Sequence, residues 1–366
     1  MIFGEHASKR AGKEARKMGM KSILLVTDPG LIALGIPEKL ANLLKEVGLS
    51  VQIFSDVAAN PTDTNVEAGI AMYNEHATDG IVALGGGSAM DTAKAIGLMK
   101  THPLPLAQYD NAKGGMKKIT NQLPPLIAIP TTSGTGSEVS SFSIITDTKH
   151  KTKLVLGSPS LIPCLALVDP SLTLTLPREV TINTGVDALT HLIEAYVSTI
   201  SNPLIDHLAL FGLELLGKSL RSVVEHPDDL RSRSDVMLAA TTGGLVYTQK
   251  FLGINHAMAH ALSALYDTAH GLANGLLLPF TMEFNACRNT NLYDLVGAAL
   301  GGEDGITEVR SLLKDIGMEL GLRKYGVDKN DFEILALKAF EDPSHVTNPH
   351  KPVTVQDFEA LFLESY

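Results

Sequence analysis

The stretch that decides the fold reads IVALGGGSAMDTAKAIG and spans residues 81–97. Its apolar run, typical of a buried strand, ends at Leu84, and a helical pattern begins at about Ser88. Ser88 and Asp91 have the spacing of a capping box, which predicts the start of that helix. The three glycines at 85–87 would let the backbone approach a ligand, and phosphate is the usual occupant of such a helix N-terminus. The pattern matches neither G-x-G-x-x-G nor the P-loop motif, so a tight turn without a ligand is the alternative.

Similar runs extend outward from this stretch through the first half of the chain. Short β-rich runs occur at 22–28, 51–57, 80–88, 126–132, 142–147, 153–157 and 164–170. Their alternation with helical patterns predicts a parallel sheet covered on both faces. After residue 180 only helical periodicity remains, over 184–199, 204–224, 231–248, 252–265, 272–288, 306–320, 329–341 and 354–365. We therefore expect a nucleotide-type α/β domain over 1–176 and an all-helical domain over 177–366.

Composition excludes several classes of partner. The chain has 366 residues with 40 acidic and 30 basic side chains, a formal net charge of −10, and no basic block that would suit nucleic acid. No apolar run reaches the length of a membrane span, and the N-terminus lacks the apolar core of a signal peptide. Cys164 and Cys287 are too few for a disulfide framework. These features predict a cytoplasmic protein with no nucleic-acid or membrane partner.

Two further segments of the first half carry polar groups at predicted strand ends. The loop IPTTSGTGSEVS at 129–140 combines hydroxyl side chains with two glycines directly after a strand. Together with the glycine turn it suggests a pyrophosphate site, because ligands of α/β folds bind at the carboxyl ends of parallel strands. Asp28 ends another strand, where a carboxylate can bind a ribose diol and repel a 2′-phosphate. A polar loop and a helix cap before Pro29 are the alternatives for these two features.

Histidines with helical spacing mark the second half. Asp187 and His191 are four residues apart, which places both side chains on one helix face. His256, His260 and His270 follow in an Ala-rich, apolar segment. One carboxylate with several imidazoles suits a divalent transition metal, whereas a buried hydrogen-bonded histidine and a surface ion pair are the alternatives for each feature alone. Spacing does not determine which histidine is not a ligand.

These segments, in this order, closely resemble the iron-containing (group III) alcohol dehydrogenase family. The resemblance is carried by FG (3–4), VTD (26–28), NPT (60–62), GGGSAMDTAKAI (85–96), IPTTSGTGSEV (129–139), LIP…VDP (161–170), TGVDALTHLIEAY (184–196), HAMAHALSALYDTAHGLANGLLLP (256–279) and TNP (347–349). It implies a Rossmann-like dinucleotide-binding domain followed by a helical metal-binding and catalytic domain, as in the dehydroquinate synthase-like superfamily.

The resemblance also implies roles for particular residues. The metal ligands would be Asp187, His191, His256 and His270, usually holding Fe²⁺ and in some members Zn²⁺, while His260 would help to move the proton. The positions implied for NAD(H) are Asp28, Asn60, Gly85, Gly86, Gly87, Ser88, Asp91, Thr131, Thr132, Thr135 and Lys153. The expected activity is interconversion of a small primary alcohol and its aldehyde, by hydride transfer in the cleft between the domains.

The chain departs from the family pattern in two places. It starts at the FG turn, so the resemblance leads us to expect that the usual N-terminal strand segment is missing. Dimers of the family commonly pair through that segment, which puts the expected homodimer in doubt. Lys250 and Phe251 stand where the family has small residues, and with Phe142 and Tyr247 they would line the substrate side of the metal. One hypothesis is that Lys250 recognises an anionic group on a short aldehyde. The alternative is a lysine that reaches from a helix into solvent.

Two rival functions remain at this point. A glycerol-dehydrogenase-like or dehydroquinate-synthase-like enzyme would share the fold, but the paired DALTH and HAMAH…HG motifs favour the alcohol dehydrogenases. A nucleotide-binding regulatory protein with a purely structural metal is the rival outside the enzymes, and it would have no need for a further histidine beside the four ligands.

Overall fold

The computed structural model describes residues 1–287, 289 and 291–366. The chain forms two compact units: Met1–Thr132 with Ser137–Thr173, and Ser133–Gly136 with Leu174–Tyr366. The sequence places a single boundary at 176/177 and gives no sign that the short segment Ser133–Gly136 packs with the helical unit. That packing depends on backbone approach, since a Cβ on Gly136 would lie 2.5 Å from the Cα of Gly244.

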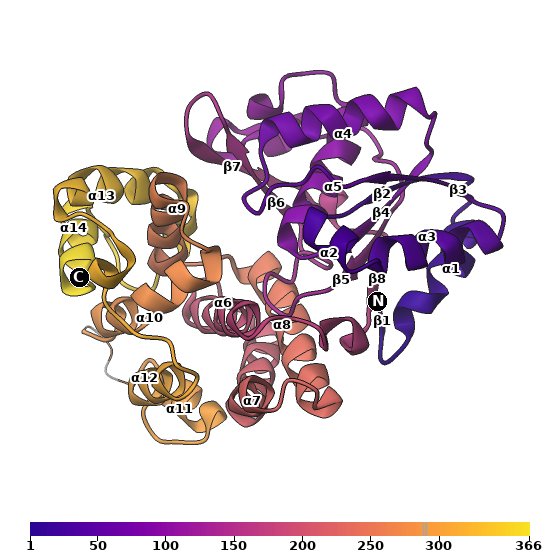
Figure 1. The fold of residues 1–366 in the computed structure, drawn as a ribbon. Helices are drawn as coiled ribbons and strands as arrows, with labels where there is room; N and C mark the ends of the chain where they lie inside the picture. The colour runs from indigo at the N-terminus through magenta and orange to yellow at the C-terminus, as the bar shows by residue number, and fades with distance from the viewer. Residues whose placement is uncertain (288, 290) are drawn as a thin grey trace. The chain divides into compact units, whose positions relative to one another are not determined.

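The first unit is built on a parallel six-stranded sheet (Figure 1). Its strands, in spatial order, are β1 (Ile2–Phe3), β8 (Leu165–Val168), β5 (Leu126–Pro130), β4 (Gly80–Gly85), β2 (Ser22–Val26) and β3 (Ser50–Phe54). The helices of this unit are α1 (Ala11–Lys17), α2 (Pro29–Ala33), α3 (Ile36–Glu46), α4 (Asp63–Glu75) and α5 (Gly87–Thr101). The predicted fold class, a parallel α/β domain followed by a helical one, is confirmed.

Both faces of the sheet are covered, which explains why its strands are apolar throughout. Leu24 and Ile81 point to one face and share a core with α4 and α5. Ile23 and Val82, their neighbours in the chain, point to the other face and share a core with α1 and α3.

Two of the predicted strands do not join this sheet. β6 (Phe142–Asp147) and β7 (Thr152–Gly157) pair with each other as an antiparallel hairpin. The expectation that all β-rich runs form one parallel sheet is therefore wrong for these two. The physical reason is the link of four residues at 148–151, because a parallel connection needs a crossover of a dozen or more residues.

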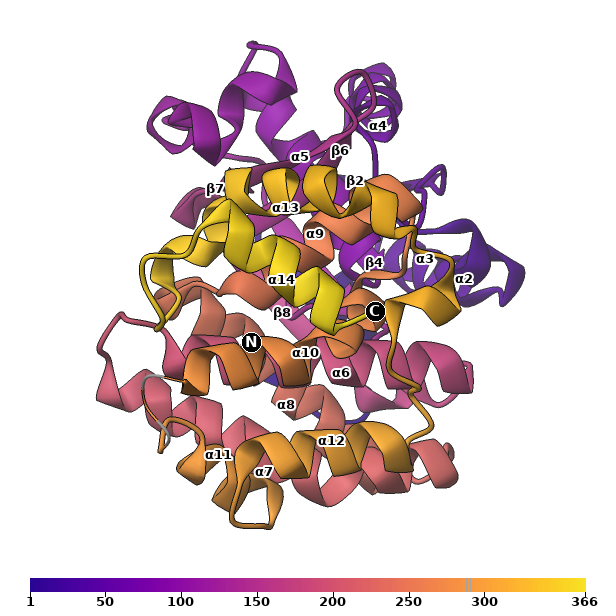
Figure 2. The same ribbon diagram turned by 90° about the vertical axis from the view of Figure 1, so that its left-hand side faces the viewer.

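The second unit is helical. It contains α6 (Arg178–Val197), α7 (Pro203–Glu225), α8 (Leu230–Lys250), α9 (Ile254–Tyr266), α10 (His270–Ala286), α11 (Asp294–Leu300), α12 (Gly305–Asp315), α13 (Phe332–Glu341) and α14 (Val355–Glu364). Helices α9, α10, α13 and α14 share one apolar core, and Figure 2 shows α13 and α14 side by side. The short helix α11 is not among the helices that the sequence predicts.

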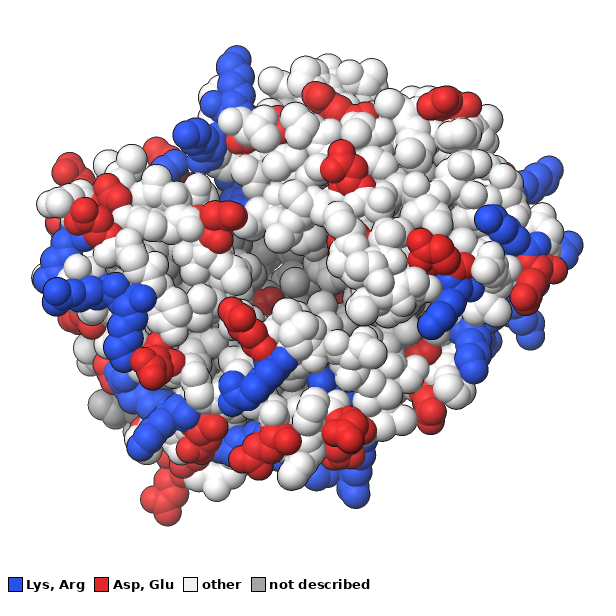
Figure 3. Space-filling view, viewed as in Figure 1, with Lys and Arg blue, Asp and Glu red and all other residues white. Residues whose placement is uncertain are grey.

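The described surface and helices bear on charge and on membrane spans. On the face in Figure 3, basic and acidic side chains are interspersed, without a broad area of one sign. Among the described residues, no helix is both long enough and apolar enough to cross a bilayer.

Candidate metal centre and nucleotide site

Three helices of the second unit bring the predicted metal ligands together. Asp187 and His191 lie one turn apart on α6, His256 lies in the first turn of α9, and His270 is the first residue of α10. One ligand atom from each lies within 4.8 Å of the others. Asp187 Oδ1 is 3.9 Å from the Nε2 atoms of His191 and His256 and 3.4 Å from Nε2 of His270. Three imidazoles and one carboxylate converging in this way suit a divalent transition metal.

A second carboxylate on α6 orients one of these imidazoles. Oε2 of Glu194 lies 2.5 Å from Nδ1 of His256, and its two oxygens also accept the backbone N–H groups of Asn255 (2.7 Å) and His256 (3.3 Å). Such a carboxylate holds the proton on Nδ1 and leaves the lone pair of Nε2 for a metal. Burial raises the pKa of Glu194, whereas the N–H groups of Asn255 and His256 favour its ionised form, the form that holds the proton on Nδ1 of His256.

The environment favours the neutral form of two of these imidazoles, the form that metal binding requires. Burial lowers the pKa of His256 well below its ordinary value, and the neighbouring His191, His270 and His260 lower it further. Burial also lowers the pKa of His191, against the attraction of Asp187. The donor set therefore fits a metal ion in chemistry, protonation and spacing.

Asn274 orients the carboxylate ligand. It lies one turn after His270 on α10, is fully buried, and donates from Nδ2 to Oδ1 of Asp187 at 2.8 Å. The sequence analysis does not single out Asn274 or Glu194. Their helical spacing was available as a signal, because Glu194 stands seven residues after Asp187 and Asn274 four after His270.

His260 stands beside the four ligands and makes different contacts. It lies one turn after His256 on α9, and its ring stacks on that of His270 with centroids 5.2 Å apart. Its Nδ1 faces Oδ2 of Asp342 at 2.8 Å. His260 is therefore held by a carboxylate outside the candidate metal set, which leaves it available for proton transfer.

The segment Ser133–Gly136 closes over the same region of the helical unit. The phenol of Tyr247 donates to the backbone oxygen of Thr135 at 3.0 Å, and the Tyr247 ring centroid lies 4.6 Å from that of His191. Thr135, predicted for the cofactor, thus belongs to the helical unit by packing. Tyr247 lies next to a candidate metal ligand, as a residue lining a substrate site would.

The glycine turn has the geometry that the sequence predicts, but a different helix start. Gly85 has φ +155°, and a Cβ there would lie 2.7 Å from Cβ of Ala89, so only glycine fits. The predicted capping box is wrong: α5 begins at Gly87, with Gly86 as an N-cap that has no side-chain bond to the helix. Ser88 donates its hydroxyl to the Ala59 carbonyl instead, at 2.6 Å. Because Gly86 has no side chain with which to cap the first turn, the N–H groups of that turn suit an anionic ligand.

Asp91 is used inside the first unit. Oδ1 accepts the hydroxyl of Ser137 at 2.7 Å, and Oδ2 accepts the N–H of Ile144 at 2.9 Å. Next to it, the fully buried Lys94 donates to Ser137 Oγ (2.8 Å), the Phe142 carbonyl (2.7 Å) and Ser140. Burial lowers the pKa of Lys94 to about 8. The pair joins the first turns of α5 to the 137–144 segment, so Asp91 supports the nucleotide loop through other residues.

Several predicted cofactor residues meet at the carboxyl ends of the strands. The N–H of Thr131 donates to the Gly85 carbonyl at 3.0 Å, and the side chain of Thr132 lies against Gly86. Lys153 donates to Asn60 Oδ1 at 3.0 Å, on the β6–β7 side of this region.

Asp28 is a helix cap, the alternative considered for it, and it also faces the glycine turn. Oδ1 caps α2 by accepting the N–H of Leu31 at 3.1 Å. Oδ2 faces Gly85, where a Cβ would lie 3.2 Å from it. One oxygen thus fixes the helix start while the other is turned toward the glycine turn.

The remaining residues predicted for the substrate side belong to different units. Phe142 belongs to β6 in the first unit, and Phe251 ends α8 with 40% of its surface exposed. Lys250 is 1% exposed, forms an ion pair with Asp206 and donates to the Tyr196 carbonyl at 3.0 Å. Its ammonium already has an anionic partner within the helical unit, which counts against the hypothesis that it recognises an anionic aldehyde.

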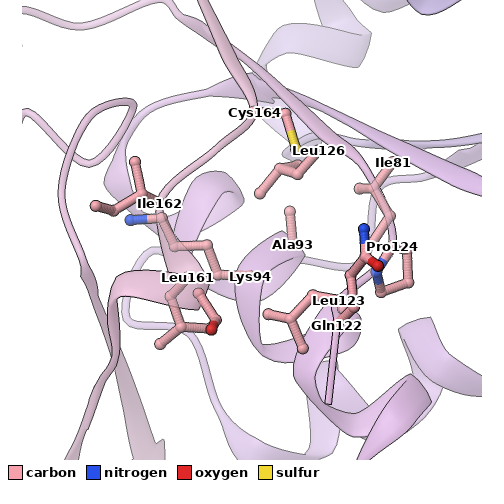
Figure 4. A pocket seen from close by; sticks show the side chains of 12 residues that line it. Ile81, Ala93, Lys94, Gln122, Leu123, Pro124, Leu126, Leu161, Ile162 and Cys164 are labelled. Atoms are coloured by element: carbon pink, nitrogen blue, oxygen red, sulfur yellow. The ribbon is translucent and has the colours of Figure 1, made fainter. Parts of the chain in front are cut away.

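Two of the cavities lined by described residues lie away from the glycine turn and the histidine cluster. One of about 180 Å³, shown in Figure 4, is lined mainly by apolar side chains such as Leu126, Ile162 and Leu161. Ile81 and Leu126 place it at the amino ends of β4 and β5, away from the glycine turn. The other, of about 480 Å³, lies beside α7 and includes Asp206.

A nucleotide-type turn in one unit and a histidine–carboxylate cluster in the other are the parts of a metal-dependent oxidoreductase. Comparisons with known proteins identify the family. The sequence-family model for iron-containing alcohol dehydrogenase matches residues 1–170. The family model for the C-terminal domain of Fe-containing alcohol dehydrogenases matches residues 181–366. The chain therefore belongs to the iron-containing alcohol dehydrogenases, and it is an oxidoreductase that interconverts alcohols and aldehydes.

Individual relatives cover the full chain. The 1,3-propanediol dehydrogenase of Klebsiella pneumoniae is 37% identical over 100% of this chain and 96% of its own length. The NAD-dependent methanol dehydrogenase of Bacillus methanolicus is 34% identical over 98% of this chain and 96% of its own. A crystal structure of 1,3-propanediol oxidoreductase superposes with a TM-score of 0.96 at 36% identity, covering 100% of this chain and 97% of that one.

Proposed function

We propose that this enzyme uses NAD(H) and a divalent metal to interconvert a small, neutral primary alcohol and its aldehyde. The observation that carries the proposal is the convergence of Asp187, His191, His256 and His270, whose ligand atoms lie within 4.8 Å of one another. Fe²⁺ is the metal we propose, on the strength of the family. Zn²⁺ is the competitor, because it binds more tightly than Fe²⁺ to most nitrogen and oxygen sites.

The residues around the glycine turn support a preference for NAD over NADP. The uncapped first turn of α5 suits a pyrophosphate, with Gly86 and Thr132 close together beside it. Asp28 keeps Oδ2 turned toward Gly85, and a carboxylate there would accept bonds from a ribose diol and repel a 2′-phosphate.

Oxidation of the alcohol removes a hydride from the carbinol carbon, which NAD⁺ accepts, and a proton from the hydroxyl. When bound, the metal would act as a Lewis acid on the oxygen and ease loss of that proton. Asp187 and the three histidines would hold it, and Glu194 and Asn274 orient His256 and Asp187 for that purpose. His260 is the group we assign to carry the proton to water, since it lies beside the ligands and is held by Asp342.

The proposed substrate class rests on the names of the relatives and on the pairing of Lys250. Relatives named for 1,3-propanediol and methanol act on short neutral alcohols, and we extend that class to this chain. Because Lys250 is already paired with Asp206, an anionic substrate is not part of the proposal.

Two finer properties belong to the proposal as well. Family membership supports a homodimer or larger homo-oligomer, which light scattering would measure. Two free, exposed cysteines support a reducing compartment such as the cytoplasm, and fractionation of cells would test it.

The test uses metal-stripped protein reloaded separately with Fe²⁺ and Zn²⁺. NADH oxidation is followed by absorbance with a panel of short neutral and anionic aldehydes. We expect turnover of the neutral aldehydes, restored by metal and abolished by Asp187→Ala, with NADPH much less effective. Turnover that is independent of metal, or equal for anionic aldehydes, would contradict the proposal.

A further inference from the structure

The structure pairs His260 with a carboxylate that the sequence analysis does not single out. Asp342 Oδ2 lies 2.8 Å from Nδ1 of His260, across 82 residues of chain. Both side chains are largely buried, with about a tenth of each exposed. A buried pair at this distance is a specific hydrogen bond, held at 2.8 Å by the packing of two helices.

Asp342 is itself fixed by the chain around it. It ends α13 and caps the following 3₁₀ helix Pro343–Thr347, where Oδ1 accepts the N–H of Ser344 at 2.8 Å. Its backbone oxygen lies 2.6 Å from Nδ1 of His345. One carboxylate oxygen is therefore committed to the cap, and the other is presented to His260.

The carboxylate is suited to accept on both oxygens. Oδ1 lies 2.8 Å from the backbone N–H of Ser344 and Oδ2 lies 2.8 Å from Nδ1 of His260, an arrangement that suits an ionised carboxylate. An ionised carboxylate has no proton to donate, so the hydrogen of this bond must sit on Nδ1 of His260. The lone pair of the neutral imidazole is then on Nε2.

The ring orientation is fixed as well. The His260 ring stacks on His270 with an interplanar angle of 19°, and it meets the ring of His256 at 74° with centroids 6.0 Å apart. Ring packing restricts rotation, and the bond to Asp342 selects one of the two ring flips. Together they define which nitrogen is a proton acceptor and where it lies.

We propose that Asp342 is a positioning residue that holds His260 in the tautomer and orientation needed to take the alcohol proton. This inference rests on the proposed function, in which His260 carries that proton. As the alcohol O–H bond breaks, its hydrogen forms a bond with Nε2, and the resulting imidazolium passes a proton to water. Asp342 stabilises that imidazolium through the same hydrogen bond and keeps its own charge throughout.

The sharpest variant is Asp342→Asn, which preserves shape and removes the charge. If the amide oxygen keeps the bond from Ser344, the amide NH₂ group faces Nδ1 and donates to it, which moves the imidazole proton to Nε2. We expect kcat to fall by about 100-fold, as for loss of a general base. The Kd of NADH and the Kd of the metal should both stay within about twofold of wild type. The side-chain hydrogen bonds described for Asp342 are to His260 and Ser344, which are neither candidate metal ligands nor predicted cofactor residues.

Asp328→Asn is the matched control. Asp328 also caps a short 3₁₀ helix, accepting the N–H of Asn330 at 2.9 Å, and it lies in the same unit. Asp328 is exposed, and the bond described for its side chain is to a backbone N–H rather than to a histidine, so Asp328→Asn tests the loss of a cap alone and should leave kcat unchanged. Asp342→Glu keeps the carboxylate and should retain more activity than the asparagine variant, and it serves if the latter does not fold.

A double-mutant cycle with His260→Ala gives the decisive readout. If Asp342 acts through His260, then Asp342→Asn has no further effect on kcat once His260 is alanine. Nitrogen-15 NMR of the histidines, with His260 assigned by its alanine variant, reports the tautomer independently of activity. Equal kcat in Asp342→Asn and wild type, independent losses in the cycle, or an unchanged tautomer would each overturn the inference. Wild-type protein that turns over no alcohol or aldehyde would instead overturn the proposed function.

Discussion

Glu194 offers a direct test of how the structure prepares the metal centre. Its carboxylate lies 2.5 Å from Nδ1 of His256 and accepts a hydrogen bond from the backbone N–H of Asn255 at 2.7 Å. Glu194→Gln keeps the size of the side chain but replaces one acceptor oxygen with a donor. If the amide NH₂ faces His256, the imidazole proton must move to Nε2, the atom that faces Asp187 and the metal position.

The size of the effect follows from this geometry. Loss of a carboxylate that orients a metal-bound histidine lowers metal affinity by about 10–100-fold, or about 1.4–2.7 kcal/mol. If the amide turns the other way, its NH₂ meets the N–H of Asn255, and a buried donor without an acceptor costs about 1–3 kcal/mol of folding free energy. Either orientation produces a measurable loss.

The assay is competition for Zn²⁺ or Co²⁺ between the protein and a chromophoric chelator. Thermal unfolding in a metal chelator measures the metal-free protein and separates the two outcomes. Glu14→Gln is the control, because Glu14 is a buried carboxylate of the first unit that pairs with Arg10 and Lys17. Metal affinity in Glu194→Gln within twofold of wild type, with unchanged unfolding, would refute the assigned role.

Three further predictions concern the first unit. Gly97→Ala should stabilise the protein by about 1–2 kcal/mol, because the added methyl group would enter the apolar cavity at ordinary contact distances. Gly69→Ala should destabilise the protein, because its methyl group would lie 2.2 Å from the Ile96 side chain. Asp169→Asn should cost about 1–3 kcal/mol, because its oxygens accept five N–H and O–H donors. Lys94→Met should leave buried carbonyls unpaired and weaken NADH binding about tenfold.

Each of these has its own measurement. Chemical denaturation gives the free energies of the glycine variants, and a less stable Gly97→Ala would show that the cavity is not as open as described. Burial alone would raise the pKa of Asp169, but its hydrogen bonds outweigh burial. The folded-state pKa of Asp169 therefore lies below the ordinary 3.8. Its contribution is therefore complete above the unfolded pKa and is lost as the pH falls through the folded pKa. A difference between wild type and Asp169→Asn that persists in stronger acid would contradict this. For Lys94→Met, titration of NADH fluorescence should show the weaker binding, and an unchanged Kd would contradict it.

Local patterns predict the elements well because their causes are local. The buried strand before the glycine turn and the helical spacing of Asp187 and His191 depend on neighbours within a few residues. The errors have physical causes too. Ser88 and Asp91 have capping-box spacing, but distant partners at Ala59 and Ser137 compete for both side chains. Lys250 stands where a substrate-facing residue is expected, but its ammonium forms an ion pair with Asp206 of another helix.

The sequence by itself determined the strand–turn–helix around Gly85, the helical second half and the family of the enzyme. Only the tertiary structure decided which carboxylate hydrogen-bonds to which histidine. Glu194 pairs with His256, 62 residues away in the sequence, and Asp342 pairs with His260, 82 residues away. Periodicity reports the face of a helix on which a residue lies. The partner across the interface depends on how the helices pack, and for a buried polar group that partner sets its protonation, its tautomer and its chemistry.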